Sequence, residues 1–404
     1  MSIKRETAVK KNVRPLIKWT GGKYDEFEEF SQFIPAFNNY YEPFFGGGGV
    51  FFALSPIGKS YLNDKSTDLI QFYNQVKNKT PFLQHQFFLY ADAWDKATDL
   101  SKEIIEELMP SFTQFIGHTI DKQALFIIIS DCINAIKQID YFPLFDEPFI
   151  INKDNFLSFL SLSIADKFNR IKNIQHKENT IFLHDELCQH VETGVKSGLY
   201  LYLRSLSNHV VKKRLILPIE KVVANWFFVR EFCYASMFRF NKNGEFNIPY
   251  GGIAYNKKNF RAKVNALFSV PVQEVFRKAA FTNLDFEDFL KKYSPTENDF
   301  IFLDPPYDSE FSEYDQNVFT KNDQIRLRDT ILKCKGKCMV VIKETAFIKD
   351  LYSGTAFSMI DFDKVYTYNV RGRNNRGTKH LIILNYAVEV EPSKAKKALI
   401  KTFV

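Results

Sequence analysis

Three short strand-like runs in this sequence end beside a glycine or at an acidic residue, and no other feature restricts the fold as strongly. They are "YYEPF" at 40–44, "SYLND" at 60–64 and "DFIFLD" at 299–304. Two more strand-like runs, "CMVVIK" at 338–343 and "KHLIILNYAV" at 379–388, follow a helical segment, "KNDQIRLRDTILKC". Strands that alternate with helices indicate an α/β sheet with helices on both faces. Ligands of such sheets bind beyond the carboxyl ends of the strands.

The sequence changes in character between residues 85 and 215. The segments "KEIIEELMPSFTQFIGHTI", "KQALFIIISDCINAIKQI" and "NFLSFLSLSIADKFNRIKNI" have the apolar spacing of amphipathic helices and contain no glycine-rich turn. We therefore expect a discontinuous sheet domain at 1–84 and 256–390, interrupted by a mostly helical insert at 85–255. The charged C-terminal segment 391–404 reads as a weakly ordered tail.

Composition and charge indicate a folded protein but do not identify its partner. The chain has 404 residues, of which 45% are hydrophobic and 25% charged, as expected for a folded protein of two domains. Its net charge of +7 is compatible with a polyanionic partner, although many basic proteins have none. No apolar run reaches the roughly 18 residues of a membrane span. A charged N-terminus without an apolar segment, together with five scattered cysteines, predicts a cytoplasmic protein with reduced thiols and no metal site.

A run of four glycines, in "EPFFGGGGVFFAL", lies between a predicted strand and a predicted helix. Glycine lets the backbone turn sharply and approach a ligand closely. Gly46 and Gly48 have the spacing of the dinucleotide fingerprint, but its third position is Phe51. The segment "TGGK" at 20–23 precedes Tyr24 rather than Ser or Thr, so it is not a phosphate loop. Four glycines nevertheless favour a ligand-binding loop over an ordinary tight turn.

Asp64 ends the second predicted strand, where a carboxylate can accept hydrogen bonds from a ribose. An Asp in this position is equally common as a helix N-cap, and the sequence does not decide between the two. Trp19 and Lys23 can likewise be read as ligand contacts or as a core aromatic and a surface charge.

The tetrapeptide Asp304-Pro305-Pro306-Tyr307 ends the strand at 299–304. Proline fixes its own φ and restricts the residue before it, so this segment is stiff. The Asp304 carboxylate and the Pro305 carbonyl are two fixed acceptors, which suit an amino group with two hydrogens to donate. Tyr307 adds an aromatic face on which a planar base can stack. The alternative is a Pro-Pro turn that only terminates the strand.

A β-hairpin is predicted from "FRFNKNGEFNIPYGG", with its turn at Asn243-Gly244. Arg239 and Lys242 alternate with aromatic residues in it. Arg239 can donate two hydrogen bonds to a guanine edge, or it can contact phosphate instead. The basic segment "RGRNNRG" at 371–377 is either a contact to a nucleic acid backbone or a solvated turn.

In this order, the segments closely resemble the Dam-type (alpha-group) family of N6-adenine-specific DNA methyltransferases, which use S-adenosyl-L-methionine. The resemblance covers about half the chain and leaves out the insert at 85–215. It rests on "PLIKWTGGK" (15–23), "YYEPFFGGGGVFF" (40–52), "YLNDKSTDLIQFYN" (61–74), "REFCYASMFRFNKNGEFNIPYGG" (230–252), "DFIFLDPPY" (299–307) and, more loosely, "VYTYNVRGRNNRGTKHLIILNY" (365–386).

The resemblance implies a Rossmann-like methyltransferase sheet and a target-recognition function for the helical insert with its hairpin at 234–252. The residues that it implies for the cofactor are Trp19, Lys23, Glu42, Pro43, Phe44, Gly46, Gly48, Asp64 and Asp304. Those that it implies for catalysis are Asp304, Pro305, Pro306 and Tyr307. The expected DNA contacts are Tyr234, Arg239, Asn241, Lys242, Asn247, Pro249, Arg371 and Arg373.

The implied reaction transfers a methyl group to the N6 amine of an adenine that is flipped out of double-stranded DNA, without a metal or a covalent enzyme intermediate. The implied setting is a restriction-modification system, with a restriction endonuclease that acts on the same site and an enzyme associated with the nucleoid. The alternatives are an N4-cytosine or RNA methyltransferase, a solitary or phage-borne adenine methyltransferase, and a catalytically silent DNA-binding protein.

Overall fold

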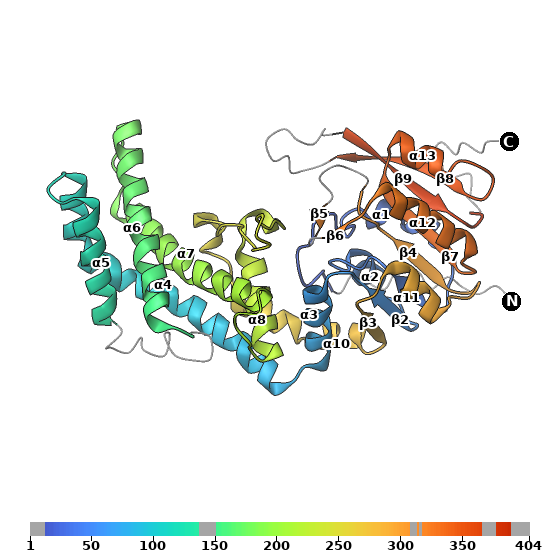
Figure 1. The fold of residues 1–404 in the computed structure, drawn as a ribbon, viewed down its shortest axis with the longest axis horizontal. Coiled ribbons are helices and arrows are strands. Elements are labelled where there is room, and N and C mark those ends of the chain that lie inside the picture. Colours follow the sequence, from blue (N-terminus) through green and yellow to red (C-terminus); the bar gives the residue numbers. More distant parts are fainter. Residues whose placement is uncertain (1–12, 137–150, 308–312, 315–316, 366–376, 389–404) are drawn as a thin grey trace. The chain divides into compact units, whose positions relative to one another are not determined.

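The chain forms two compact units in a computed structural model (Figure 1). The sheet unit comprises residues up to Lys77 and those from Ser269 onward, and the helical unit comprises Asn78–Phe268. Arg371 and Arg373 lie outside the residues that the structure describes. The described residues are 13–136, 151–307, 313–314, 317–365 and 377–388.

A seven-stranded sheet forms the centre of the sheet unit, in the order β3-β2-β1-β4-β7-β9-β8. The strands from β3 to β7 in this order are parallel, whereas β9 runs antiparallel to both β7 and β8. Strands β5 and β6 pair with each other and form a separate two-stranded sheet. The strands are β1 (Tyr40–Glu42), β2 (Ser60–Asn63), β3 (Ala279–Thr282), β4 (Phe300–Leu303), β5 (Glu313–Tyr314), β6 (Asn317–Val318), β7 (Lys337–Lys343), β8 (Ser358–Val365) and β9 (Gly377–Leu384).

Helices cover both faces of this sheet, as the sequence predicts. Side chains alternate along β4, so Ile301 and Leu303 join the apolar cluster under α11, α12 and α13, while Phe302 stacks on Phe30 of α1 across the opposite face. Tyr73 of α3 stacks on Phe281 of β3. The helices are α1 (Phe27–Phe30), η1 (Ser31–Phe33), α2 (Gly49–Leu54), α3 (Thr67–Asn78), α10 (Val270–Phe276), α11 (Phe286–Tyr293), α12 (Lys321–Lys333) and α13 (Ala346–Leu351). Buried on both sides, β4 is wholly apolar, and so is the central part of β7 from Cys338 to Ile342.

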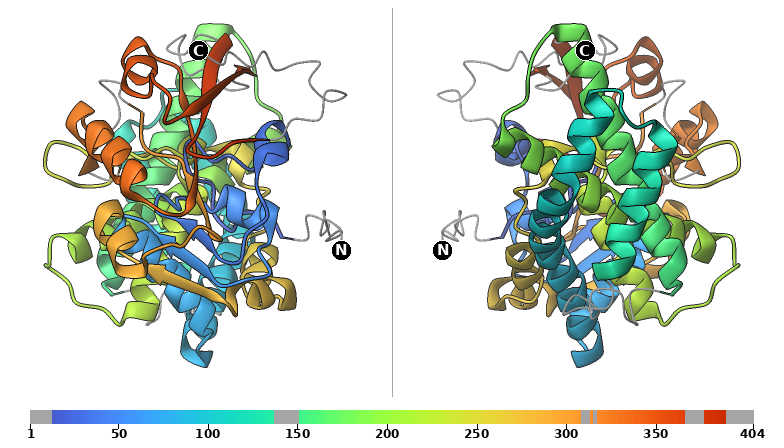
Figure 2. Two further views of the ribbon diagram at one scale, coloured as in Figure 1. Left: turned by 90° about the vertical axis from the view of Figure 1, so that its right-hand side faces the viewer. Right: turned by 90° about the vertical axis from the view of Figure 1, so that its left-hand side faces the viewer.

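The helical unit is built from long helices that run alongside one another (Figures 1 and 2). Gly194 and Gly198 of α7 allow close packing on α6, because a Cβ at Gly198 would lie 2.8 Å from the Cα of Leu160. The predicted helical segments lie in α4, α5 and α6. The elements are α4 (Pro81–Ile116), α5 (Lys122–Ile136), α6 (Lys153–Glu178), α7 (His184–Val211), α8 (Ile219–Phe232), η3 (Tyr234–Ser236), η4 (Ile253–Tyr255) and α9 (Phe260–Leu267).

The hairpin follows α8, and antiparallel bridges pair Phe240 with Phe246 and Cys233 with Tyr250. The tip of the hairpin is the three-residue loop 242–244, in which Gly244 has a φ of 71°. A loop of this length typically ends in a residue with a left-handed backbone, so the turn lies at Asn243-Gly244, as predicted.

No helix within the described ranges is long and apolar enough to cross a membrane. The same residues contain no group of three or more His, Cys, Asp or Glu arranged to hold a metal ion.

Candidate functional site

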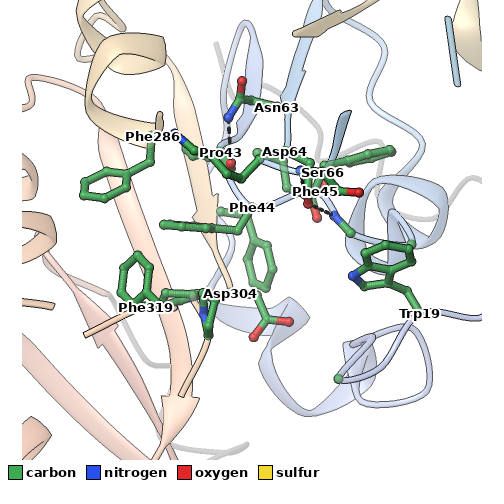
Figure 3. Close-up of a pocket in the computed structure, with 18 of the residues that line it drawn as sticks. Trp19, Pro43, Phe44, Phe45, Asn63, Asp64, Ser66, Phe286, Asp304 and Phe319 are labelled. Atoms are coloured by element: carbon green, nitrogen blue, oxygen red, sulfur yellow. Dashed lines mark hydrogen bonds between the residues drawn. The ribbon is translucent and has the colours of Figure 1, made fainter. Parts of the chain in front are cut away.

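A cavity of about 390 Å³ opens at the carboxyl ends of β1, β2 and β4, entirely within the sheet unit (Figure 3). Its position follows from the topology, because the ends of neighbouring parallel strands meet at one edge of the sheet. Of the predicted residues, Gly48 is not part of the lining; it begins α2 with a φ of 69°. The predicted residues that line the cavity are Trp19, Lys23, Glu42, Pro43, Phe44, Gly46, Asp64, Asp304, Pro305, Pro306 and Tyr307.

The Lys23 ammonium group lies against the end of β4. Its Nζ donates to both carboxylate oxygens of Asp304, at 2.7 and 2.9 Å, and to the Tyr307 hydroxyl at 3.3 Å. A further bond to the Gly21 carbonyl, at 2.9 Å, holds the ammonium from its own loop. The Lys23 side chain is 1% exposed and that of Asp304, which lines the cavity, is 19% exposed, so the ion pair is largely shielded from solvent. This ion pair therefore fixes one orientation of the Asp304 carboxylate.

Glu42 is a second carboxyl group at the cavity, and it is buried. Burial raises the pKa of Glu42 well above its ordinary value, and the neighbouring charges of Asp304 and Asp64 raise it further. The Tyr40 hydroxyl donates to Glu42 Oε2 at 2.8 Å, which opposes the rise in the Glu42 pKa. Glu42 and Asp304 thus have different environments, one desolvated and one paired with a cation.

The glycine loop after β1 is tied to the end of β2 by Asp64. The Asp64 carboxylate accepts hydrogen bonds from the backbone N–H of Gly46 at 2.8 Å and of Ser66 at 2.9 Å. A Cβ at Gly46 would lie 2.8 Å from Trp19 Cδ1, and the φ of Gly46 is 50°, so only glycine fits this turn without strain. Asp64 therefore shapes the cavity through the loop as well as lining it.

Three aromatic rings cluster in the lining of the cavity, and only Phe44 among them was predicted from the sequence. The rings of Phe44, Phe286 and Phe319 lie 5.5 to 6.0 Å from one another. The Arg326 guanidinium packs on the Phe286 ring and makes two hydrogen bonds to Asp285, at 2.8 and 3.0 Å. Asp285 and Phe286 follow β3 in "AAFTNLDFEDF", a third strand end with an acidic residue, which is the signal that could have found them.

Asn63 is a further residue that the sequence analysis missed. Its side-chain amide donates to the carbonyls of Pro43 and Leu284, and its carbonyl oxygen accepts from the Leu284 N–H. These bonds join the ends of three strands around the cavity (Figure 3). Because Asn63 is buried, an amide group without hydrogen-bond partners there would destabilise the fold, and these bonds provide the partners.

The predicted DNA-contacting residues of the hairpin all lie in the helical unit. Arg239, Lys242 and Pro249 are exposed, and Arg239 Nε donates to Asn247 Oδ1 at 3.0 Å. The Asn241 side chain instead accepts hydrogen bonds within the tip, from the N–H groups of residues 243 and 245.

Tyr234 is 43% exposed and precedes two residues with left-handed backbones, Ala235 and Ser236. Such φ values are costly for residues other than glycine, by about 1 kcal/mol or more each. Arg230 holds this segment, because its guanidinium donates to the Ser236 and Met237 carbonyls. The chain therefore keeps a strained turn that leaves a large aromatic side chain in solvent.

The sheet order and the arrangement of a glycine loop, an acidic residue and Asp304-Pro305-Pro306-Tyr307 at successive strand ends define a Rossmann-like methyltransferase fold. The sequence matches the model of the D12 class of N6 adenine-specific DNA methyltransferases over residues 19–195 and 159–368, and the chain belongs to this family. It is thus an adenine-specific DNA methyltransferase, of a class that generally takes its methyl group from S-adenosylmethionine.

Individual relatives agree with this assignment. The type II methyltransferase M.CviBI of Paramecium bursaria Chlorella virus NC1A is 30% identical over 204 residues, which is 48% of this chain and 75% of that protein. The type II methyltransferase M.MjaIII of Methanocaldococcus jannaschii is 23% identical over 396 residues, covering 93% of this chain and 99% of that protein. The DNA adenine methylase of Serratia marcescens is 23% identical over 376 residues, covering 91% and 96%.

Proposed function

We propose that the cavity binds S-adenosyl-L-methionine together with an adenine flipped out of duplex DNA, and that Asp304 and Pro305 orient the adenine N6 amine for methylation. The observation that carries this proposal is the position of the Asp304 carboxylate, which Lys23 fixes at the wall of the cavity formed by the glycine loop. The sheet unit is then the catalytic domain, and the helical unit with its hairpin provides target recognition.

The lining of the cavity fits a cationic nucleoside. Its volume of about 390 Å³ lies within the range of small-molecule sites. Five carboxyl groups and three basic side chains line it, which suits the positive sulfonium and ammonium groups of S-adenosylmethionine. Phe44 and Phe286 provide apolar ring faces for a purine.

Bound S-adenosylmethionine supplies an electrophilic methyl group. Trp19, Pro43, Phe44 and Gly46 form the wall of its site, and Glu42 and Asp64 add acceptors to that wall. Because Asp64 Oδ2 and Oδ1 already accept from backbone N–H groups, a ribose hydroxyl would use the lone pairs that remain on this carboxylate.

The adenine amine is a poor nucleophile, since its lone pair is delocalised into the ring. Hydrogen bonds from the amine to the Asp304 carboxylate and the Pro305 carbonyl localise that lone pair as the bond to carbon forms. One such group contributes about 3–4 kcal/mol to transition-state stabilisation. The Lys23 ammonium uses only part of the acceptor capacity of Asp304, since a carboxylate has about four lone-pair sites. Tyr307 provides a ring for the flipped base to pack on.

Flipping an adenine out of the duplex costs a few kcal/mol, which contacts to DNA must offset. The exposed Tyr234 and Arg239 support assignment of the hairpin to this task, with Tyr234 inserted into the base stack and Arg239 on a guanine edge. The remaining predicted contacts of the hairpin are Asn241, Lys242, Asn247 and Pro249, and Arg371 and Arg373 remain predicted backbone contacts.

The cellular role that we favour is protection of self DNA in a restriction-modification system. The methyl group would then protect the site from a restriction endonuclease that cuts the same sequence. The support is that three of the relatives are named type II methyltransferases. A solitary or phage-borne enzyme is the second candidate, supported by the relative named as a DNA-N-6-adenine-methyltransferase of Escherichia phage P1.

The test of the chemistry is to incubate duplex DNA with the enzyme and tritiated S-adenosylmethionine, and then to hydrolyse the DNA to nucleosides. Label in N6-methyl-2′-deoxyadenosine is expected. Label in N4-methyl-2′-deoxycytidine would contradict the base assignment. Asp304→Ala is expected to abolish labelling while the variant still binds DNA, and near-normal turnover would refute the role given to Asp304. Asp361→Ala, on the exposed part of β8, is the matched control. Sequencing of methylated bases in a host that expresses the gene then identifies the target site.

A further inference from the structure

One face of α7 makes a continuous series of hydrogen bonds to the segment that contains the hairpin. The residues that form this face are spaced by three or four positions, as required for one stripe of a helix. We call them the α7 stripe; six lie on α7 and the seventh, Lys212, is its C-cap residue: Gln189, Thr193, Lys196, Tyr200, Arg204, Asn208 and Lys212. Their partners lie between residues 243 and 256, and they are contacted in reverse order along the chain.

The second arm of the hairpin is bound along the C-terminal half of the stripe. The Tyr200 hydroxyl and Arg204 Nη1 both donate to the Ile248 carbonyl at 2.8 Å. Asn208 donates to the Phe246 carbonyl at 3.1 Å and accepts from the Phe246 N–H at 2.8 Å. Its amide thereby replaces the peptide group of a neighbouring strand. Lys212 Nζ contacts the Asn243 carbonyl at the tip.

The match between helix and hairpin has a simple geometric origin. Four residues of an α-helix advance by about 6 Å, and two residues of an extended chain advance by about 6.6 Å. Every fourth residue of α7 can therefore meet every second residue of the hairpin arm. This is the spacing from 204 to 208 on the helix and from 248 to 246 on the arm.

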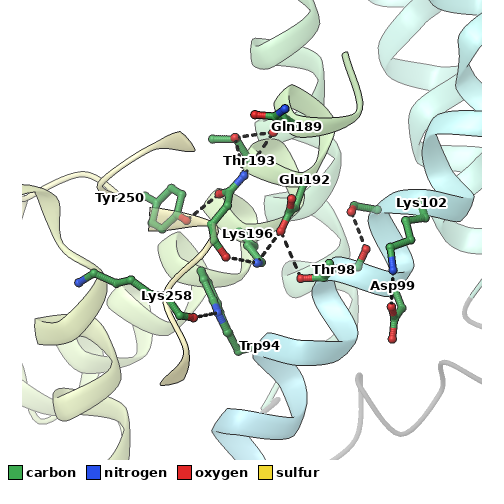
Figure 4. Close-up of polar contacts among 12 residues, drawn as sticks. Trp94, Thr98, Asp99, Lys102, Gln189, Glu192, Thr193, Lys196, Tyr250 and Lys258 are labelled. Carbon is green, nitrogen blue, oxygen red and sulfur yellow. Dashed lines mark hydrogen bonds and ion pairs between the residues drawn. The ribbon is translucent and has the colours of Figure 1, made fainter. Parts of the chain in front are cut away.

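The base of the hairpin is held by a buried polar network at the other end of the stripe (Figure 4). Lys196 is 1% exposed, and its ammonium group donates to Glu192 Oε1 at 2.6 Å and to the Asn256 carbonyl at 2.8 Å. The Asn256 amide donates to Thr193 Oγ1 at 3.0 Å and accepts from the Tyr250 hydroxyl at 2.9 Å. The tip and the base of the hairpin are thus both bonded to the α7 stripe.

From this geometry we infer that the α7 stripe is a template that sets the position of the hairpin, and that Asn208 is a positioning residue for target-site discrimination. The inference rests on the proposed role of the hairpin in reading DNA. Two backbone hydrogen bonds join the arms here, from the Asn241 N–H to the Glu245 carbonyl and from the Asn247 N–H to the Arg239 carbonyl. Such a short hairpin is weakly held by its own pairing, so the two bonds from Asn208 to Phe246 help to fix the direction in which Arg239 and Asn247 project. The helical unit then acts in specificity through support of the hairpin.

The test compares Asn208→Ala and Asn208→Asp with native enzyme and with Asn173→Ala, an exposed asparagine on α6. Asparagine-to-alanine removes both bonds to Phe246. Asparagine-to-aspartate keeps the acceptor and removes the donor. The measurement is the ratio of kcat/KM on duplexes with the target site to kcat/KM on duplexes with one base pair changed, the target having been found by sequencing of methylated DNA.

We expect Asn208→Ala to lower this ratio about fivefold to tenfold, and Asn208→Asp to lower it too. S-adenosylmethionine affinity and kcat on the target should remain at native values, and Asn173→Ala should retain the native ratio. An unchanged ratio in both Asn208 variants, or a parallel loss of cofactor affinity and kcat, would overturn the inference. Native enzyme that puts no methyl group into DNA would instead refute the proposed function.

A second measurement does not depend on activity. Hydrogen exchange of native enzyme should show a protected Phe246 amide, and Asn208→Ala should expose that amide selectively while protection of the α7 core persists. Rapid exchange of this amide in the native enzyme would also contradict the inference.

Discussion

Lys23 and Asp304 are 281 positions apart in the chain, yet the Lys23 ammonium donates to both oxygens of the Asp304 carboxylate at 2.7 and 2.9 Å. The lysine belongs to the loop that packs beneath the glycine run, since a Cβ at Gly49 would lie 3.0 Å from the Lys23 N atom. The aspartate belongs to the end of β4. The pair therefore joins the two walls of the cavity, and Lys23 has a role beyond the cofactor contact that the sequence suggested.

Replacement of Lys23 by methionine should slow methyl transfer by about 100-fold, because the Asp304 carboxylate loses the group that orients it. Methionine keeps most of the side-chain volume, so no large cavity is left at this position. Single-turnover rates on duplex DNA measure the change, and equilibrium dialysis measures cofactor affinity. Lys18→Met, at an exposed position of the same segment, is the control. Loss of cofactor affinity at an unchanged rate would mean that Lys23 serves the cofactor instead.

Phe286→Leu should weaken S-adenosylmethionine binding about twofold to tenfold, because the variant keeps an apolar side chain but loses the ring face. Phe289→Leu is a matched control, since Phe289 is a buried phenylalanine on the same helix that packs against Tyr41 rather than lining the cavity. Isothermal titration with the cofactor compares the two variants. Equal affinities in Phe286→Leu and Phe289→Leu would exclude the Phe286 ring as part of the cofactor site.

The sequence predicted the core of the cavity because each of its parts is local. β4 is a fully buried run of four residues, and the two prolines after it leave Asp304 at a strand end in any parallel sheet. The glycine loop and Asp64 follow β1 and β2 in the same way. In contrast, β3 contains two alanines in four residues, a weak strand signal, so Asp285 and Phe286 after it were not recognised.

Contacts between residues that are far apart in the sequence could not be predicted either. Nothing local to Lys23 indicates that its partner is Asp304. The spacing of the α7 stripe is visible in the sequence, but its partners between 243 and 256 become apparent only when the helix and hairpin are placed together. Likewise, α9 belongs to the helical unit because Phe260 packs on Phe227, Phe228 and Phe232 of α8, a contact between segments distant in sequence.

The raised pKa of Glu42 predicts a specific dependence of stability on pH. A carboxyl group with a folded-state pKa above its unfolded value of about 4.3 keeps its proton in the folded protein after the unfolded chain has lost it. Rising pH then favours unfolding, by up to about 1.4 kcal/mol per pH unit until the folded-state pKa is reached. Glu42→Gln, which can still accept from the Tyr40 hydroxyl, removes this titration.

As the pH is raised from about 5 to about 8, the urea midpoint of native enzyme should therefore fall relative to that of Glu42→Gln. Glu29→Gln, at an exposed position of α1, should show no such trend. Parallel pH profiles for native enzyme and Glu42→Gln would show that Glu42 titrates alike in the folded and unfolded states.

Arg239→Ala should relax the choice of target site without slowing methylation of the preferred one at saturating DNA. A guanidinium that makes two hydrogen bonds to a guanine contributes about 1–3 kcal/mol of discrimination at that base pair, so the preference there should fall about fivefold to 150-fold. Competition between duplexes that differ at single positions measures the effect, with Lys102→Ala, an exposed lysine of α4, as the control. A uniform loss of affinity across all sequences, with a smaller salt dependence of binding, would instead identify Arg239 as a phosphate contact, because neutralised phosphates contribute to every site alike. If neither affinity nor preference changes, the hairpin surface around Arg239 does not face the DNA.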